Sequence, residues 1–315
     1  MIEHRLSIRQ VEEAHAVISP AFIHTPQYIC EPLSGFFDCE LMIKVETINP
    51  IRSFKGRGAD YLVSKTNELE LICASAGNFR QAMAYACRKA KKKLIVYASV
   101  NANPLKVDRM RLLGANVILF GEDFDAAKEE ARKVSRQNNI RFVEDSADIE
   151  TLAGAGTIAI ELTKTFSSID VLLVPLGNGA LLNGVARVMK EKSPKTKIIA
   201  VQAQGASAMV DSWRAGSLIS YEHIDTIADG IGVRLPVEQA LQDMKGLVDG
   251  ARLVEEKSIL QAMKLLHEHA GLVVEPSGAV GIAALLENKS DFRSQQVAII
   301  LCGGNLTQTQ MKQWL

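Results

Sequence analysis

The sequence has little of several features that mark whole classes of protein. Its 36 Lys and Arg residues are matched by 36 Asp and Glu residues, so the net charge is zero. A chain without net charge has no overall field that attracts nucleic acid or an anionic membrane. It has no apolar stretch near the ~18 residues of a membrane helix, and the N-terminal MIEHRLSIRQ carries charges where a signal peptide has an apolar core. We expect a cytoplasmic protein without a nucleic-acid or membrane partner.

Cysteine is also scarce, and its arrangement excludes two kinds of site. The five cysteines are odd in number and lack the C-x-x-C spacing: Cys30, Cys39, Cys73, Cys87 and Cys302. Neither a disulfide framework nor a zinc site is therefore indicated. Low-complexity segments, Pro/Gly/Ser linkers and repeats of fixed period are absent from the sequence. The 315 residues are enough for one large or two modest α/β domains.

Short apolar runs alternate with longer amphipathic stretches along the chain. The runs are rich in β-branched residues and predict buried strands at 71–74, 94–98, 116–120, 171–175, 198–202 and 297–301. The amphipathic stretches predict helices at 78–89, 104–113, 123–137, 156–165, 179–191 and 258–269. This alternation indicates mostly parallel sheets covered by helices. Because one compact layer rarely holds so many strands, we expect two sheets, with a site between them at the carboxyl ends of the strands.

The segment Ser53-Phe54-Lys55-Gly56-Arg57-Gly58 places a lysine at a predicted transition from strand to helix. The glycines keep backbone crowding low around Lys55. A lysine that forms a Schiff base must be a neutral amine, which a partly desolvated pocket favours. Taken alone, the triplet Ser-Phe-Lys is more simply a surface lysine at a helix start.

A second motif, Gly177-Asn178-Gly179-Ala180-Leu181, follows an apolar strand and opens a helix. This placement directs free backbone N–H groups and a helix dipole at an anion, and a phosphate is the natural ligand. A dinucleotide site is weaker, because Gly184 comes too late for G-x-G-x-x-G and the next strand ends in Gln202 where an acidic residue would hold a ribose. A turn that caps a helix without any ligand stays a third interpretation.

Two further turns, Ser75-Ala76-Gly77-Asn78 and Cys302-Gly303-Gly304-Asn305, complete a set that is typical of a pyridoxal phosphate site. Together with segments 24–26 (HTP), 226–233 (TIADGIGV) and 275–279 (EPSGA), they make the chain resemble the threonine/serine dehydratase and serine racemase family over nearly its whole length. These are fold-type II, tryptophan synthase beta-like enzymes that use pyridoxal 5'-phosphate. The resemblance implies an α/β fold of two domains, which we place at 1–46 with 148–315 (large, cofactor-binding) and 47–147 (small, mobile).

The resemblance also implies roles for individual residues. Lys55 matches the lysine that forms the Schiff base, is displaced by the substrate amine and takes the Cα proton, and Phe54 matches its neighbour beside the cofactor. Asn78 matches the residue that hydrogen-bonds the 3-hydroxyl oxygen of the ring. Cys302 matches the Ser, Thr or Cys that faces the pyridine nitrogen. Two sets remain: the phosphate loop (Gly177, Asn178, Gly179, Ala180, Leu181) and the loop that grips the substrate carboxylate (Ser75, Ala76, Gly77, Asn78, Phe79).

A thiol at Cys302 has a chemical consequence of its own. A carboxylate there would keep the pyridine nitrogen protonated, whereas a thiol leaves it mostly neutral and the ring a weaker electron sink. Negative charge at Cα is then relieved by loss of a β-substituent, which favours elimination over transamination. The structural alternative for Cys302 is a small buried residue that ends a strand.

Several positions depart from the family pattern. Asn178 and Ala180 interrupt a phosphate loop that usually has four glycines; because Asn tolerates positive φ and Ala adds only a methyl group, we expect binding in a narrower cradle. Phe79 stands where the family commonly has His. Arg52 and Arg80 could each recognise a second acidic group on a substrate through a bidentate contact. A solvated or salt-bridged helix arginine is the simpler interpretation of both.

Ala76 discriminates between reactions of the family. Racemases resemble the pattern Ser-Ser-Gly-Asn, whose second serine reprotonates the carbanion, and a methyl group cannot do so. The segment 201–208 (VQAQGASA) offers no carboxylate for a hard cation, so we expect no Mg²⁺ or Ca²⁺ there. Because the chain ends soon after Asn305, we expect no C-terminal regulatory domain and no feedback by isoleucine.

These observations predict a lyase that converts a small β-hydroxy amino acid such as L-threonine or L-serine into a 2-oxo acid and ammonia. Alternatives on the same scaffold are a 3-hydroxyaspartate dehydratase, an amino-acid racemase and a β-replacement synthase. A catalytically silent pyridoxal phosphate-binding protein is more distant, and a nicotinamide oxidoreductase more distant still. Members of the family are commonly dimers, so we expect a homodimer.

Overall fold

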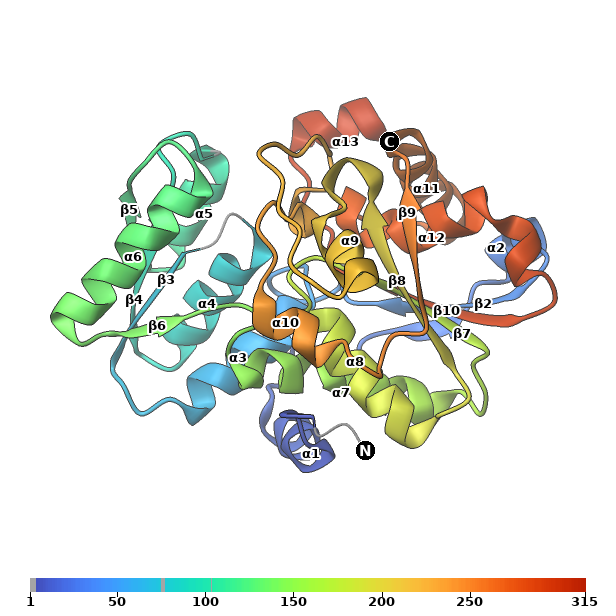
Figure 1. Ribbon diagram of the computed structural model, residues 1–315, viewed down its shortest axis with the longest axis horizontal. Helices are drawn as coiled ribbons and strands as arrows, with labels where there is room; N and C mark the ends of the chain where they lie inside the picture. Colours follow the sequence, from blue (N-terminus) through green and yellow to red (C-terminus); the bar gives the residue numbers. More distant parts are fainter. Residues whose placement is uncertain (1–3, 75–76, 103) are drawn as a thin grey trace.

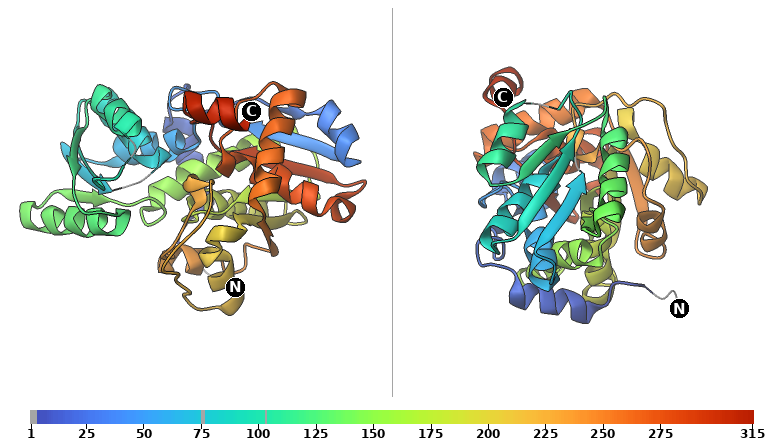
Figure 2. Two further views of the ribbon diagram at one scale, coloured as in Figure 1. Left: turned by 90° about the horizontal axis from the view of Figure 1, so that it is seen from above. Right: turned by 90° about the vertical axis from the view of Figure 1, so that its left-hand side faces the viewer.

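The structure is a computed structural model that describes residues 4–74, 77–102 and 104–315. Its strands form two separate sheets in two lobes that lie side by side (Figures 1 and 2). The larger sheet has the strand order β1-β2-β10-β7-β8-β9. The strands are β1 Gln27–Ile29, β2 Glu40–Val45, β7 Val171–Pro175, β8 Lys197–Ala203, β9 Gly250–Val254 and β10 Gln296–Leu301. Neighbouring strands are parallel apart from the antiparallel pair β1 and β2.

The smaller sheet lies in the left-hand lobe of Figure 1 and has the order β5-β4-β3-β6, with every pair parallel. Its strands are β3 Glu70–Ala74, β4 Lys93–Ala98, β5 Asn116–Leu119 and β6 Arg141–Val143. The helices α4 Asn78–Lys89 and α5 Pro104–Leu112 cover one face, and α6 Phe124–Asn138 covers the other. The alternation of strand side chains produces this arrangement, since Leu71 and Cys73 pack with the first face and Ile72 and Ala74 with the second.

The larger sheet is likewise covered on both faces. One core contains Leu172 and Val174 of β7 with the helices α1 Ile8–Val17, α3 Lys55–Lys65, α7 Ile149–Thr165 and α8 Ala180–Lys192. A second core contains Val171 and Leu173 with α2 Glu31–Phe37, α11 Glu256–Ala270 and α12 Pro276–Glu287. The remaining helices are α9 Ala208–Ala215, α10 Glu238–Asp243 and α13 Gln308–Trp314, with 3₁₀ turns at Gln204–Ala206, Asp229–Ile231 and Lys289–Phe292. The first core continues into the small lobe, so the lobes share one hydrophobic interior.

Close packing of α3 on α7 fixes the helix that carries Lys55. A Cβ atom on Gly154 would lie 2.5 Å from the Cα of Gly58, and one on Gly58 would lie 2.9 Å from the Cα of Thr151. Only glycine permits these two backbones to approach so closely. The second glycine of the lysine motif therefore holds α3 against the large lobe.

Most predicted elements agree with the structure to within two residues at either end, and the strand at 171–175 and the helix at 78–89 agree fully. The helix predicted from 156 begins earlier, at Ile149. Two buried elements escaped prediction for physical reasons. In β2 the polar Lys44 interrupts the apolar pattern, and α12 is buried from Pro276 to Leu285 and has no polar face to give a helical period.

The structure also corrects the local setting of Lys55. The last strand before it, β2, ends at Val45, and residues 46–54 form turns with one isolated bridge between Ser53 and Gly303. The predicted transition from strand to helix is therefore wrong on the strand side and right on the helix side, because α3 begins at Lys55. The domain boundaries near 47 and 147 stay a prediction. Among the described residues, no helix is long and apolar enough to cross a membrane.

Candidate active site

A cavity of about 750 Å³ lies between the two lobes. It is lined where strands of both sheets reach their carboxyl ends: Pro175 at the end of β7, Cys302 after β10, Gly77 after β3, and Glu144 after β6. In open α/β sheets this is the edge at which ligands bind. Of the predicted site residues that the structure describes, all line this one cavity: Phe54, Lys55, Gly77, Asn78, Phe79, Gly177, Asn178, Gly179, Ala180, Leu181 and Cys302.

Lys55 is the first residue of α3, and backbone hydrogen bonds attach the segment before it to the end of β10. The Phe54 N–H donates to the Cys302 carbonyl (3.0 Å), and the Gly304 N–H donates to the Arg52 carbonyl (2.9 Å). The Lys55 Nζ lies 2.5 Å from Oδ2 of Asp145 and 4.6 Å from the centre of the Phe54 ring. A lysine amine thus enters the cavity between a carboxylate and an aromatic ring.

A buried network of ion pairs holds α3 in the large lobe. The Arg57 guanidinium is fully buried and donates to Glu46 (2.8 and 2.9 Å) and to Glu161 (2.6 and 3.1 Å), while the Lys44 Nζ lies 2.5 Å from Glu161. Burial alone would raise the pKa of Glu161, but hydrogen bonds and charge from Arg57 and Lys44 outweigh it and lower the pKa to about 2. Glu161 is therefore a carboxylate at all ordinary pH values, and it joins β2, α3 and α7.

The segment 177–181 forms a cradle at the start of α8. This helix begins at Ala180 and has no acidic residue in its first turn, so its N-terminus is open to an anion. Gly179 has φ 96°, and a Cβ atom there would lie 2.9 Å from the Cβ of Ala240. Asn178 is not among the described residues with positive φ, so its tolerance of that conformation is not needed. The site fits a phosphate group.

Cys302 closes the inner wall beside Ser277. Burial first, and then the neighbouring Glu275 carboxylate, raises the pKa of the Cys302 thiol far above its ordinary value, so the group is a neutral thiol. Its Sγ donates to the Ser277 carbonyl (3.5 Å). The Ser277 Oγ also belongs to the wall, and within the described part of the chain this buried atom has no hydrogen-bond partner. A buried hydroxyl without a partner indicates a place for a polar ligand atom.

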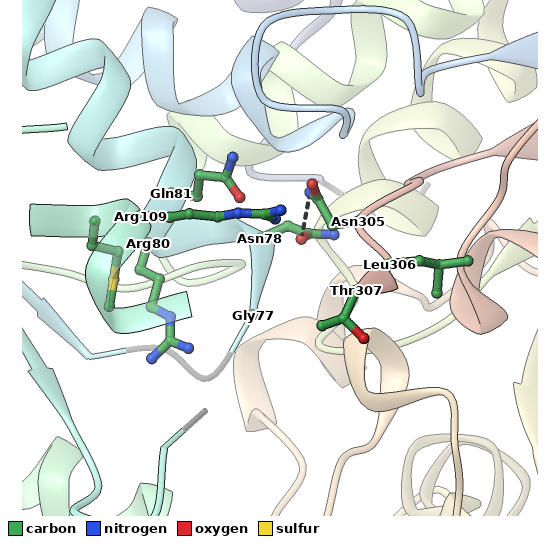
Figure 3. Close-up of a pocket in the computed structure, with 9 residues that line it drawn as sticks. Gly77, Asn78, Arg80, Gln81, Arg109, Asn305, Leu306 and Thr307 are labelled. Atoms are coloured by element: carbon green, nitrogen blue, oxygen red, sulfur yellow. Dashed lines mark hydrogen bonds between the residues drawn. The ribbon is translucent and has the colours of Figure 1, made fainter. Parts of the chain in front are cut away.

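Asn78, the first residue of α4, is held in one orientation by residues that follow β10 and precede α12. Its Nδ2 donates to Oε1 of Glu275 (2.7 Å), and its Oδ1 accepts from Nδ2 of Asn305 (3.0 Å), the bond drawn dashed in Figure 3. The Asn78 amide has a second N–H besides the one given to Glu275. Because Asn78 lines the large cavity, that N–H can serve a ligand there.

Arg80 and Arg52 are not among the residues that line the large cavity. Arg80 is buried and lines a separate small pocket with Arg109 of α5 and Thr307, and in Figure 3 its guanidinium points away from the Asn78–Asn305 pair. Arg52 is exposed, with φ 54°. The lining of the cavity therefore does not support the hypothesis that either arginine binds a second acidic group of a substrate.

Two predictions are not tested by the structure: the roles of Ser75 and Ala76, and the lack of a cation at 201–208. Ser75 and Ala76 of the substrate loop lie outside the described residues, so their roles stay predictions. In the part of the chain that the structure describes, no cluster of three or more His, Cys, Asp or Glu side chains could hold a metal ion. In the segment 201–208, Gln202 is buried and its Oε1 accepts the Val210 N–H (3.0 Å). The predicted lack of Mg²⁺ or Ca²⁺ stays a prediction.

Among the acidic residues that line the cavity, sequence reasoning missed the two that hydrogen-bond to predicted site residues, Asp145 and Glu275. Glu275 was part of a recognised motif without a role, and the structure shows that it orients Asn78. Asp145 follows the short strand β6 directly after Glu144. An acidic pair at the carboxyl end of a parallel strand was the available signal, but β6 itself was not predicted.

The cavity as a whole fits pyridoxal phosphate, because it joins a cradle that a glycine Cβ would obstruct, an unpartnered Ser277 hydroxyl and an accessible Lys55 amine. Comparisons with known proteins agree with this fit. The chain is 33% identical over 305 residues to an L-threonine ammonia-lyase of Thermotoga maritima, which covers 96% of this chain and 76% of that protein. The threonine deaminase isoform 2 structure of Solanum lycopersicum superposes with a TM-score of 0.90 at 28% identity, covering 99% of this chain and 89% of that one. Maize serine racemase gives a TM-score of 0.91 at 27% identity, covering 98% and 96%.

The same conclusion comes from a family model described as "Pyridoxal-phosphate dependent enzyme", which matches residues 18–303. The predictions of an α/β, fold-type II architecture and of pyridoxal phosphate as cofactor are confirmed. Because this match spans most of the sequence, the chain belongs to the family of pyridoxal-phosphate dependent enzymes.

Proposed function

We propose that this chain catalyses the α,β-elimination of a small β-hydroxy amino acid, such as L-threonine or L-serine, to a 2-oxo acid and ammonia. The observation that carries the proposal is one cavity that joins the Lys55 amine, the anion cradle at α8 and the neutral Cys302 thiol. The relatives named threonine ammonia-lyase and threonine deaminase support the same reaction class.

Each group has a part in this proposal. Bound pyridoxal phosphate would supply the electron sink that makes the Cα–H bond of an amino acid acidic. The cradle 177–181 holds the phosphate, and the free N–H of Asn78 holds the ring oxygen. Lys55 is the base that accepts the Cα proton, since it is the lysine amine that enters the cavity beside them. The N-terminus of α4, at Gly77–Phe79, holds the substrate carboxylate.

Cys302 directs the outcome of that proton transfer. A buried neutral thiol cannot hold a pyridine nitrogen protonated as a carboxylate does, so charge at Cα is relieved by loss of the β-hydroxyl. Because Ala76 stands in the substrate loop, the chain also lacks the second serine of the Ser-Ser-Gly-Asn pattern that racemases of this family resemble. We therefore place elimination before racemisation.

Arg52 and Arg80 are not among the residues that line the cavity. The other cations in its wall besides Lys55 are paired: Lys128 and Arg132 with Glu144, and Arg234 with Asp125. We therefore favour a substrate with a small neutral side chain over 3-hydroxyaspartate.

Three wider features belong to the same proposal. We assign the enzyme to the cytoplasm. We also propose that it is a homodimer, because members of this family commonly are. We assign residues 47–147 to a small domain that moves over the substrate, because the four-stranded sheet lies within that range and contributes one wall of the cavity.

The test is a spectrum followed by turnover in the same cuvette. Purified protein should absorb at about 410 nm, as a lysine Schiff base of the cofactor does. L-Threonine, L-serine and L-threo-3-hydroxyaspartate are then added in turn, and oxo acid and ammonia are measured. Equal amounts of both products from threonine or serine support the proposal. A band that changes with none of the substrates contradicts it.

Two variants of α3 make the assignment to Lys55 specific. Lys55→Ala should lose both the band and turnover. Lys65→Ala removes a lysine from the last turn of the same helix, where it contacts Glu13 at the surface (3.7 Å), and should keep both. Full activity of Lys55→Ala would exclude Lys55 as the base.

A further inference from the structure

We propose that Asp145 is a further catalytic residue of this site, the carboxylate that takes the proton from the Lys55 ammonium and so frees the amine to react. The inference rests on the proposed function, because it concerns the same lysine. It starts from the shortest polar contact of that lysine, the 2.5 Å between Lys55 Nζ and Asp145 Oδ2. Both side chains line the large cavity, and both are largely buried, with 16% and 13% of their surface exposed.

The Asp145 carboxylate differs from that of Glu161, whose hydrogen bonds hold elements of the fold together. Each oxygen of Glu161 accepts at least two hydrogen bonds, from Arg57, Lys44 and the His24 N–H. By contrast, Asp145 Oδ1 is buried and accepts none within the described residues. A buried carboxylate oxygen without a donor lowers stability. Asp145 is therefore poorly stabilised as a carboxylate, which favours transfer of the Lys55 proton to its Oδ2.

The loop that presents Asp145 is fixed on both sides of it. Before it, Glu144 pairs with Lys128 and with Arg132 (2.7 Å) of α6. After it, Ser146 is fully buried with φ 69°, a conformation that is strained for a non-glycine residue. Arg5 maintains that conformation by donating to the Ser146 carbonyl (2.8 Å). Between these anchors the side chain of Asp145 turns into the cavity.

The proton transfer is balanced and local. The proton leaves Nζ of the Lys55 ammonium and joins Oδ2 of Asp145, so that the nitrogen lone pair becomes free and the two charges disappear together. When bound, pyridoxal phosphate would supply an aldehyde for this neutral amine, and water would leave as the carbon–nitrogen double bond formed. Once Asp145 has released that proton to water, the same carboxylate is placed to receive the proton of an incoming substrate ammonium. An asparagine keeps the size of Asp145 but cannot accept a proton.

The experiment follows capture of the cofactor by the enzyme freed of it. Wild type, Asp145→Asn and Asp148→Asn are each mixed with pyridoxal 5'-phosphate, and stopped-flow absorbance at about 410 nm records the formation of the lysine–cofactor bond. Asp148 belongs to the same loop but pairs with Arg141 (3.1 Å), and it is not among the residues that line the cavity. General base catalysis contributes roughly 100-fold or more in typical enzymes. We expect Asp145→Asn to be slowed at least about tenfold, and Asp148→Asn to stay within about twofold of wild type.

A second measurement separates proton transfer from disturbance of the fold. Pyridoxine 5'-phosphate has no aldehyde, so its affinity reports the cavity without the lysine, and it should be equal in wild type and Asp145→Asn. Formate, a carboxylate small enough for the space left by Asp145→Ala, should accelerate capture by that variant. Capture by Asp145→Asn within twofold of wild type, or a slowing matched by lost pyridoxine 5'-phosphate affinity, would overturn the inference. A wild type that forms no band at all would instead refute the proposed function.

Discussion

The buried network behind α3 makes a quantitative prediction for the substitution Glu161→Gln. Glu161 is 4% exposed and accepts hydrogen bonds from Arg57 (2.6 Å) and Lys44 (2.5 Å). Glutamine keeps the shape of the side chain but removes the negative charge between two buried cations. Removal of one partner of a buried pair leaves an uncompensated charge and typically costs about 3–5 kcal/mol.

The pKa of Glu161 gives an independent magnitude and the dependence on pH. It lies at about 2 in the folded chain, against an ordinary value of 4.5, so the carboxylate form is favoured by folding. The difference corresponds to roughly 3 kcal/mol of stabilisation at neutral pH. Because the folded pKa is the lower one, this stabilisation is complete above about pH 4.5 and is lost as the pH falls toward about 2.

Urea unfolding followed by circular dichroism measures the effect. At pH 7 Glu161→Gln should lower the free energy of unfolding by about 3 kcal/mol. The deficit relative to wild type should shrink as the pH falls from about 4.5 toward about 2. The matched control is Glu13→Gln, which loses surface pairs with Arg9 (3.1 Å) and Lys65 (3.7 Å) and should change stability by less than about 1 kcal/mol. A deficit under 1 kcal/mol at pH 7, or one that stays constant with pH, would refute the reasoning.

Three further substitutions test the site. Lys55→Ala should abolish the band at about 410 nm and all turnover while the far-ultraviolet circular dichroism is retained; full activity of this variant would contradict the assignment. Gly179→Ala forces a side chain into φ 96° and to 2.9 Å from the Ala240 Cβ, so it should weaken pyridoxal phosphate binding in a fluorescence titration by about 1–2 kcal/mol; unchanged affinity would show that the cradle adapts. Ala76→Ser should raise racemisation relative to elimination, measured by chiral chromatography of the recovered amino acid, and an unchanged ratio would show that a hydroxyl there does not reach the substrate.

The sequence was informative wherever structure follows from local pattern. The strand Val171–Pro175 and the cradle 177–181 could be predicted together, because an apolar run that ends in glycines before a helix specifies its own geometry. The motifs that together carry the family resemblance could be read for the same reason, since the residues of each motif are consecutive. Elements without a regular pattern were missed: β2 contains the buried Lys44, and α12 has no polar face.

Contacts between distant residues were decided by the tertiary structure alone. Lys55 and Asp145 are 90 positions apart, and Asn78 and Glu275 are 197 apart, yet both pairs form hydrogen bonds in one cavity. Nothing in the local sequence specifies which of many carboxylates will face a given amine or amide, because that choice depends on how two sheets pack about a shared core. The sequence by itself determined the cofactor and those strands and helices whose apolar pattern is regular, and it predicted Lys55 as the reacting lysine. The packing of the two lobes decided which acidic side chains stand beside that lysine, since hydrogen bonds and ion pairs depend on distances in space.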